Sequence, residues 1–163
     1  MQNEAKASKP YMRPATFEDA ISLSPRLRVA DLKEISFGSN RRPMDILLEG
    51  IANSDECIAI IYEDRVVALF GVVNMWGLGG SPWMLASNDL KKIAKSFLRE
   101  AKGEVQKMLQ KYKLLENHVW AGNHDHIEWL KWMGFTVDET AEIIRGGNGG
   151  RFFHFFMREV PDV

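Results

Sequence analysis

The spacing of apolar residues predicts several short helices in the first third of the chain. The segment 11–16 is expected to form an edge strand because it contains a proline. Thr16 followed by Asp19 is typical of a helix start, and further helices are predicted over 24–35 and 41–54. The residues of the second helix that are expected to face the core are Leu27, Ala30, Leu32 and Ile35.

The composition of the chain changes at Cys57, after which β-branched and aromatic residues are frequent. A β-hairpin is predicted, with strands over 57–62 and 65–75 and a tight turn at Glu63 and Asp64. After a glycine-rich loop, 82–87 is expected to be a third strand. These three strands predict an antiparallel meander.

The longest periodic segment follows, with Ser87 or Asn88 as its expected N-cap. One face is apolar and the opposite face is rich in lysine, which predicts an amphipathic helix. Its apolar positions are Leu90, Ile93, Ala94, Phe97, Ala101, Val105, Met108, Leu109 and Tyr112.

The C-terminal part alternates between the two patterns. A strand is predicted over 115–122, a short helix over 124–133, and strands over 135–140 and 151–159, with a flexible turn at 146–150. The element order predicts one α/β (α+β) domain with a mixed sheet of about six or seven strands.

Domain boundaries, composition and charge narrow the class of protein. Residues 1–10 are expected to be a flexible arm and 11–163 one domain. The net charge is −1, which predicts neither a membrane nor a nucleic-acid partner. Binding of nucleic acid by the basic face of the long helix is a weaker alternative. The chain shows neither an apolar run long enough to cross a bilayer nor a secretory signal, and it has one cysteine. We therefore expect a cytoplasmic protein, with Cys57 as a small packed residue rather than a nucleophile.

The stretch "NHDHIEWLKWMGF", from Asn123 to Phe135, carries a family resemblance. Asn123, Ile127 and Gly134-Phe135 match the spacing of a motif in the GNAT family of N-acetyltransferases, and the hairpin "IIYEDRVVALFGVV" is similar to GNAT strands. The resemblance spans about 11–160 and implies a GNAT-like fold and acetyl-CoA as a cofactor.

A second, longer resemblance rests on five pairs of residues: Lys111-Tyr112, Val119-Trp120, Gly122-Asn123, His126-Ile127 and Leu130-Lys131. In these pairs the chain resembles an internal core protein family of short-tailed phages. The resemblance implies a phage particle or assembly protein, with phage structural proteins as partners and the host cytoplasm and the virion as locations.

The GNAT resemblance implies that the cofactor lies in a V-shaped opening between strands 82–87 and 117–122, lined by free N–H groups. Of the positions that would cradle the pyrophosphate, Asp89 and Lys92 depart from the GNAT pattern and Ala94 fits it. A solvated basic face is the alternative for these lysines. The residues implied to contact the cofactor are Leu85, Ala86, Lys91, Lys92, Ala94 and Asn123.

The catalytic groups of the family are also altered. Leu130 stands at the position where GNAT enzymes usually have a tyrosine that acts as the general acid, and leucine cannot transfer a proton. His118 is the candidate for a base that acts through water, with an ordinary histidine as the alternative. Two functions therefore stay open: a phage assembly protein with a degenerate acyltransferase site, and an active N-acetyltransferase of unknown acceptor.

His124 and His126 pose a separate question, because a His-x-His pair can bind metal. Both fall at a helix start, where residues two apart diverge, so no metal site is expected. Asn123 as a cap and Asp125 at the positive end of the helix dipole explain the cluster more simply.

Five tryptophans are many for a chain of 163 residues. Trp129 and Trp132, three positions apart, would form an aromatic flank on the short helix. Core packing is one interpretation, and self-association through a Trp-rich surface is the other.

Overall fold

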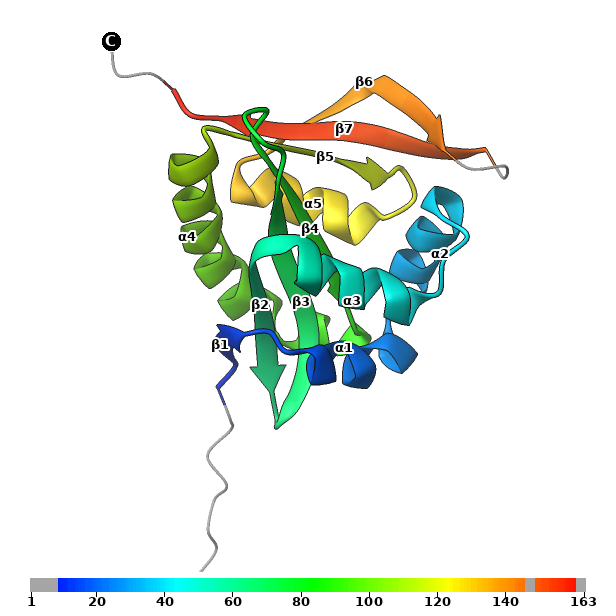
Figure 1. Ribbon diagram of the computed structural model, residues 1–163, viewed down its shortest axis with the longest axis vertical. Coiled ribbons are helices and arrows are strands. Elements are labelled where there is room, and N and C mark those ends of the chain that lie inside the picture. The colour runs from blue at the N-terminus through cyan, green and yellow to red at the C-terminus, as the bar shows by residue number, and fades with distance from the viewer. Residues whose placement is uncertain (1–8, 146–148, 161–163) are drawn as a thin grey trace, which may run out of the picture.

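A computed structural model describes residues 9–145 and 149–160 of the chain. Its centre is one seven-stranded sheet in the order β1-β2-β3-β4-β5-β7-β6, with helices on both faces (Figure 1). The predicted fold class is confirmed. In the part of the chain described, no helix is both long and apolar enough to cross a membrane.

The N-terminal third forms one edge of the sheet and the helices over one face. β1 is the edge strand that its proline predicted, and Asp19 Oδ2 accepts a hydrogen bond from the Thr16 N–H at 2.8 Å at the predicted helix start. The expected flexible arm, 1–10, falls mostly outside the described residues. The elements are β1 (Tyr11–Pro14), α1 (Phe17–Leu23), η1 (Ser24–Arg26), α2 (Val29–Gly38) and α3 (Pro43–Asn53).

The predicted meander is present. β2 (Ser54–Tyr62), β3 (Arg65–Asn74) and β4 (Gly80–Ala86) pair antiparallel in sequence order. Glu63 and Asp64 both have positive φ, at 50° and 59°, as a two-residue hairpin turn requires.

β4 and β5 diverge, and this divergence creates the central feature of the fold. β5 (Leu114–Trp120) runs parallel to β4, and the two strands pair only at Gly80 and Leu115. Between them in sequence, η2 (Asn88–Ile93) leads into α4 (Ala94–Tyr112). Ser87 is the N-cap of η2, as predicted, and its Oγ accepts from the Asp89 N–H.

The chain ends with α5 (His124–Met133), β6 (Thr136–Arg145) and β7 (Gly150–Arg158). β7 inserts between β5 and β6, which makes β6 the second edge of the sheet. The flexible turn expected at 146–150 lies largely outside the described residues.

Two apolar layers flank the sheet. On one face, α4 and α5 pack on the sheet through residues such as Phe97, Val105 and Leu130. On the other face, α1 and α3 pack through Ala20, Leu23 and Leu47. The predicted apolar face of the long helix is confirmed, since most of its positions are buried.

α2 departs from the expected pattern. Leu27 is buried just before it and Ile35 packs on the core, as predicted, but Leu32 is 39% exposed. The fully buried position is Asp31. Leu32 was expected to face the core, and the helix instead turns its charged side inward because Asp31 is hydrogen-bonded there.

Candidate functional site

A buried polar cluster occupies the divergence of β4 and β5. Asp31 lies at its centre: Oδ2 accepts from Arg28 Nε at 3.1 Å and from the Ala86 N–H at 2.9 Å. Oδ1 accepts from Arg28 Nη2 at 2.7 Å and from Asn123 Nδ2 at 3.2 Å. Each carboxylate oxygen therefore has two donors, which is why the charge is tolerated without solvent.

Asn123 joins this cluster across the fold. Its Oδ1 accepts from Arg28 Nη2 at 3.3 Å, and its side chain is fully buried. Asn123 is the N-cap residue of α5, as predicted, and its backbone O accepts from the Ile127 N–H at 3.0 Å. Its side chain makes no capping bond to the helix. The amide instead bonds to Asp31 and Arg28, because hydrogen bonds to buried charged groups are more stabilising than a bond to the N–H of an exposed helix end.

Glu34 is one turn farther along α2. Its Oε1 accepts a hydrogen bond of 2.7 Å from the Trp120 N–H at the end of β5. Burial, together with the nearby Asp31 charge, raises the pKa of this carboxyl to about 7. Glu34 is therefore poised between its charged and neutral forms near neutral pH.

His126 projects into the same region from α5. It is buried, and its Nδ1 has no hydrogen-bond partner among the described residues. Burial, followed by the Arg28 charge, lowers its pKa to about 4 against the opposing effect of Asp31. At neutral pH the imidazole is uncharged.

The arrangement of Asp31, Glu34 and His126 resembles a metal-ligand set, because one ligand atom from each lies within 4.8 Å of the others. The donor set does not fit a cation. Both Asp31 oxygens are saturated by N–H donors, and the Arg28 guanidinium already supplies the positive charge.

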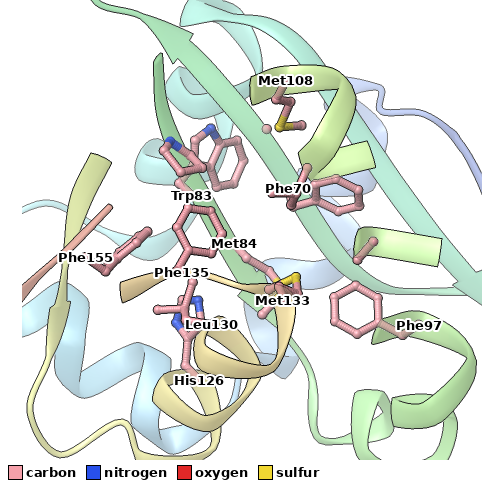
Figure 2. Close-up of a pocket in the computed structure, with 14 residues that line it drawn as sticks. Phe70, Trp83, Met84, Phe97, Met108, His126, Leu130, Met133, Phe135 and Phe155 are labelled. Carbon is pink, nitrogen blue, oxygen red and sulfur yellow. The ribbon is translucent and has the colours of Figure 1, made fainter. Parts of the chain in front are cut away.

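Two cavities meet at this cluster, one on each side of the sheet. A small apolar cavity of about 40 Å³ lies between the sheet and helices α4 and α5. Figure 2 shows the side chains that converge on it, with His126 and Leu130 from α5 and Phe97 from α4 among them. A cleft of about 380 Å³ lies on the α2–α3 side. The residues that line both are Pro82, Trp83, Met84, His126 and Phe155.

The structure brings only part of the predicted cofactor set to this place. Asn123 and Ala86 lie in the cluster, and the Ala86 N–H is bonded to Asp31. Leu85, beside it, is buried in the apolar layer under α1 and α3, and it also lines the cleft of about 380 Å³. The predicted opening therefore exists, but the Ala86 and Trp120 N–H groups in it are not free.

The other predicted cofactor residues lie outside the cluster, at the start of the long helix. Lys91 Nζ is 3.1 Å from Asp125 Oδ2, and Lys92 Nζ is 3.2 Å from Asp89 Oδ1. Ala94 is the first residue of α4, which continues directly from η2. Both lysines are thus paired with carboxylates.

The predicted catalytic position, His118, lines the cleft of about 380 Å³ together with Glu34 and His126, and its ring also contacts other residues. Its ring centroid is 5.3 Å from that of His154, and its Nδ1 is 3.4 Å from Arg145 Nη2. Burial, then the charges of Arg145 and His154, lower its pKa. Leu130 is buried and packs in the apolar cavity.

Sequence reasoning missed Arg28, Asp31 and Glu34. One pattern was available, because three charged residues recur at intervals of three and share one face of a helix. That pattern also fits a solvated face, and the residues that bury it lie about 90 positions away, as with Asp31 and Asn123 at a separation of 92.

Solved structures of N-acetyltransferases share this fold. Ard1 from Thermoplasma volcanium superposes with a TM-score of 0.71 at 11% identity, covering 93% of this chain and 99% of that one. The ribosomal-protein-alanine N-acetyltransferase from Brucella melitensis gives 0.69 at 15%, covering 91% and 99%. The spermidine N-acetyltransferase from Vibrio cholerae, solved with CoA and spermine, gives 0.65 at 11%, covering 91% and 95%. At these identities the likeness establishes the GNAT fold.

Sequence comparison leads to phage proteins. The "Probable scaffold protein gp13" of Escherichia phage T7 is 28% identical over 91 residues, which are 53% of this chain and 62% of that protein. The match thus spans about three fifths of the relative's length. The family model described as "Bacteriophage T7, probable scaffold protein Gp13" matches residues 57–141, slightly more than half of the chain. The chain belongs to this phage scaffold-protein family, and it has the GNAT fold.

Proposed function

We propose that this protein acts in phage assembly, as a scaffold or internal virion protein, and that it uses the GNAT fold as a structural unit rather than for acyl transfer. Family membership supports the assembly role, and the fold explains the resemblance to acetyltransferases. Fold alone does not assign an activity.

The main support for the proposal is that two backbone N–H groups where β4 and β5 diverge are already bonded to side chains of the protein itself. Acyl transfer from a thioester needs preorganised N–H groups that are free to bind the ligand. Here the Ala86 N–H donates to Asp31 and the Trp120 N–H donates to Glu34. A ligand would have to displace Asp31 and leave the Arg28 charge buried without a partner, which is costly.

The proposed loss extends to the phosphate end of the site. A pyrophosphate would need unpaired cations or close backbone approach at the start of α4. Lys91 and Lys92 are paired with Asp125 and Asp89, and Asp89 adds negative charge. We infer that these residues do not fit coenzyme A.

The first test is calorimetric titration with acetyl-CoA and CoA, with an active GNAT enzyme titrated in parallel. We expect no binding heat and no thermal shift at millimolar ligand. Micromolar binding that Lys92→Glu removes would contradict the loss of the cofactor site.

The second test addresses assembly directly. Quantitative mass spectrometry of purified phage particles and of their assembly intermediates should detect this chain at a fixed copy number. Its absence from both would contradict a scaffold or virion role, whatever the calorimetry shows.

A second candidate, an N-acetyltransferase of unknown acceptor, is favoured by one observation. Glu34 and His126 line the cleft of about 380 Å³, and a carboxyl with a pKa of about 7 suits a general base toward an amine. Turnover of acetyl-CoA with an amine panel, lost in Glu34→Gln, would support it over the assembly role.

A further inference from the structure

The tip of the β3–β4 hairpin presents apolar side chains to solvent. Trp76 is 89% exposed and Leu78 is 70% exposed, and Met75 beside them is also exposed. Trp76 is the most exposed of the large apolar residues in the described part of the chain. A cluster of exposed apolar residues often marks a surface that contacts another molecule, and aromatic residues are frequent in such contacts.

This tip is held in one conformation by its own backbone. Met75 N–H donates to Gly79 O at 2.8 Å, and Asn74 Oδ1 accepts from the Trp76 N–H at 2.9 Å. Trp76 adopts a left-handed φ of 49°, which is unfavourable for a large side chain. Gly79 lies against Leu114, where an added Cβ would be 2.5 Å from the Leu114 O. These contacts define the turn that presents the tryptophan to solvent.

A groove of about 690 Å³ opens directly beside the tip. Met75 forms one wall, and the open face of β5, β7 and β6 forms the floor, with His118, Ile143, Arg145 and His154 among its residues. In Figure 1 the hairpin tip reaches the β5–β7 end of the sheet. The groove is large enough for an indole ring.

The charges of the groove complement an aromatic guest. Glu116 is bonded to His154 at 3.1 Å, and Glu142 is bonded to Arg151 at 2.7 Å. The Arg145 guanidinium lies 5.4 Å from the centroid of the Phe152 ring, and its Nη2 is 3.4 Å from His118 Nδ1. It forms no ion pair with any carboxylate that the structure describes, so its positive charge is not neutralised within the groove. The tip, 74–81, contains no charged residue. A guanidinium attracts the face of an indole ring.

We propose that the tip and the groove form a two-fold interface between two copies of this chain, with Trp76 of each copy inserted beside Arg145 and Ile143 of the other. Met75 belongs to both the tip and the groove, so the two features adjoin on one face, as a reciprocal interface requires. This inference rests on the proposed assembly function, in which self-association has a role.

The size of the contact sets the expected affinity. Each inserted tryptophan removes about 150–250 Å² from water. The two tryptophans together therefore bury roughly 300–500 Å². The flanking tip residues and groove walls add to this, but the contact is small for a specific interface. We therefore expect a dimer with a dissociation constant in the micromolar range.

Sedimentation velocity and light scattering between 1 and 200 µM, taken as roughly the range for a small interface, test the proposal. Wild-type protein should show a concentration-dependent monomer–dimer equilibrium. Trp76→Ser should weaken it by roughly tenfold or more, because aromatic anchors dominate such contacts. Trp132→Ser is the matched control, since Trp132 is 50% exposed on α5, and it should leave the equilibrium unchanged.

Mixing two defective variants gives the sharper test. Trp76→Ser removes the inserted indole ring, and Arg145→Glu reverses the charge in the groove. Because the interface is symmetric, the homodimer of either variant loses both of its Trp76–groove contacts. The mixture keeps one intact contact, from Trp76 of the Arg145→Glu copy into the groove of the Trp76→Ser copy. The heterodimer should therefore be tighter than either variant homodimer.

Three outcomes would overturn the proposal: wild-type protein that is monomeric at 200 µM (roughly the upper end of the range above), equal effects of Trp76→Ser and Trp132→Ser, or a mixture no tighter than its parents. A monomer that is still found in phage particles would overturn this interface and leave the assembly function standing. Acetyl-CoA binding by a dimeric protein would contradict the proposed function and leave this interface standing.

Discussion

The carboxylate of Asp31 accepts a hydrogen bond of 2.9 Å from the N–H of Ala86, the last residue of β4. The segment before Asp31 runs along the same end of the strand: the Arg28 N–H donates to Ala86 O at 2.8 Å, and Leu27 forms a β-bridge with Ser87. The end of β4 is therefore closed by the chain's own backbone and by a buried ion pair.

Replacing Asp31 by alanine should strongly destabilise the fold. The change leaves the Arg28 guanidinium buried and the Ala86 N–H without a partner. Removing one member of a buried pair costs about 3–5 kcal/mol. Urea unfolding measures the loss in the free energy of unfolding.

Two further variants make this result specific. Asp89→Ala removes an exposed pair with Lys92 and should cost at most about 1 kcal/mol. Arg28→Met combined with Asp31→Leu removes both charges and should recover much of the stability lost in Asp31→Ala. A double variant weaker than the single one would show that the ion pair itself stabilises the fold.

Glu34 and His126 should give opposite pH dependences that nearly cancel. The folded pKa of Glu34 is raised from 4.5 to about 7, so its contribution to stability falls as pH rises through that window. The folded pKa of His126 is lowered from 6.5 to about 4, so its contribution is lost as pH falls through that window. Each effect is worth at most roughly 3 kcal/mol.

Difference curves between variants and wild type separate the two groups. Glu34→Gln keeps an acceptor for the Trp120 N–H, so it should match wild type at pH 4.5 and exceed its stability above pH 7. His126→Gln should be less stable than wild type at pH 6.5, and this difference in the free energy of unfolding should shrink as pH falls to 4. Urea midpoints at four pH values suffice, and a pH-independent difference for Glu34→Gln would refute the raised pKa.

Gly50 and Gly103 are both helical glycines, and alanine should act on them with opposite signs. A Cβ at Gly50 would lie 2.6 Å from the Trp83 ring, which is fixed by its Nε1 bond of 2.8 Å to Ser54 Oγ. A Cβ at Gly103 meets nothing within 4 Å. Thermal unfolding should show Gly50→Ala less stable by about 1–3 kcal/mol and Gly103→Ala more stable by about 0.5–1 kcal/mol.

Cys57 should resist alkylation in the folded protein. Burial, followed by the Asp19 charge, raises the pKa of its thiol to about 12. The thiolate is scarce but intrinsically more nucleophilic, so the net rate with iodoacetamide at pH 7.5 should be roughly a hundredfold below that of a free thiol. The rate in guanidinium chloride is the control, and equal rates in both conditions would contradict the burial.

The elements could be predicted from sequence wherever one side of a segment meets the core. The long helix shows this, because Phe97, Ala101 and Val105 are buried at the spacing that a single face requires. The hairpin turn at Glu63 and Asp64 followed from local chemistry in the same way.

The polar cluster could not be predicted by the same reasoning. A charged residue is stable in the interior only with partners. Arg28 is a local partner of Asp31, but Ala86 and Asn123, which complete its hydrogen bonds, are far away in sequence. The tryptophans were ambiguous for a similar reason: Trp129 is buried while Trp132 and Trp76 are exposed. Residue type does not reveal which strand tip lacks a covering element.

The long span of the polar cluster has a consequence for protein synthesis. Arg28 bonds to Asn123 across 95 positions and Glu34 to Trp120 across 86, so both side chains lack these partners when α2 leaves the ribosome. At about 5–20 residues per second, the ribosome needs roughly 5–20 s to add those residues. The contacts of this region with Ala86 can form earlier, but the polar cluster is complete only after three quarters of the chain has been made.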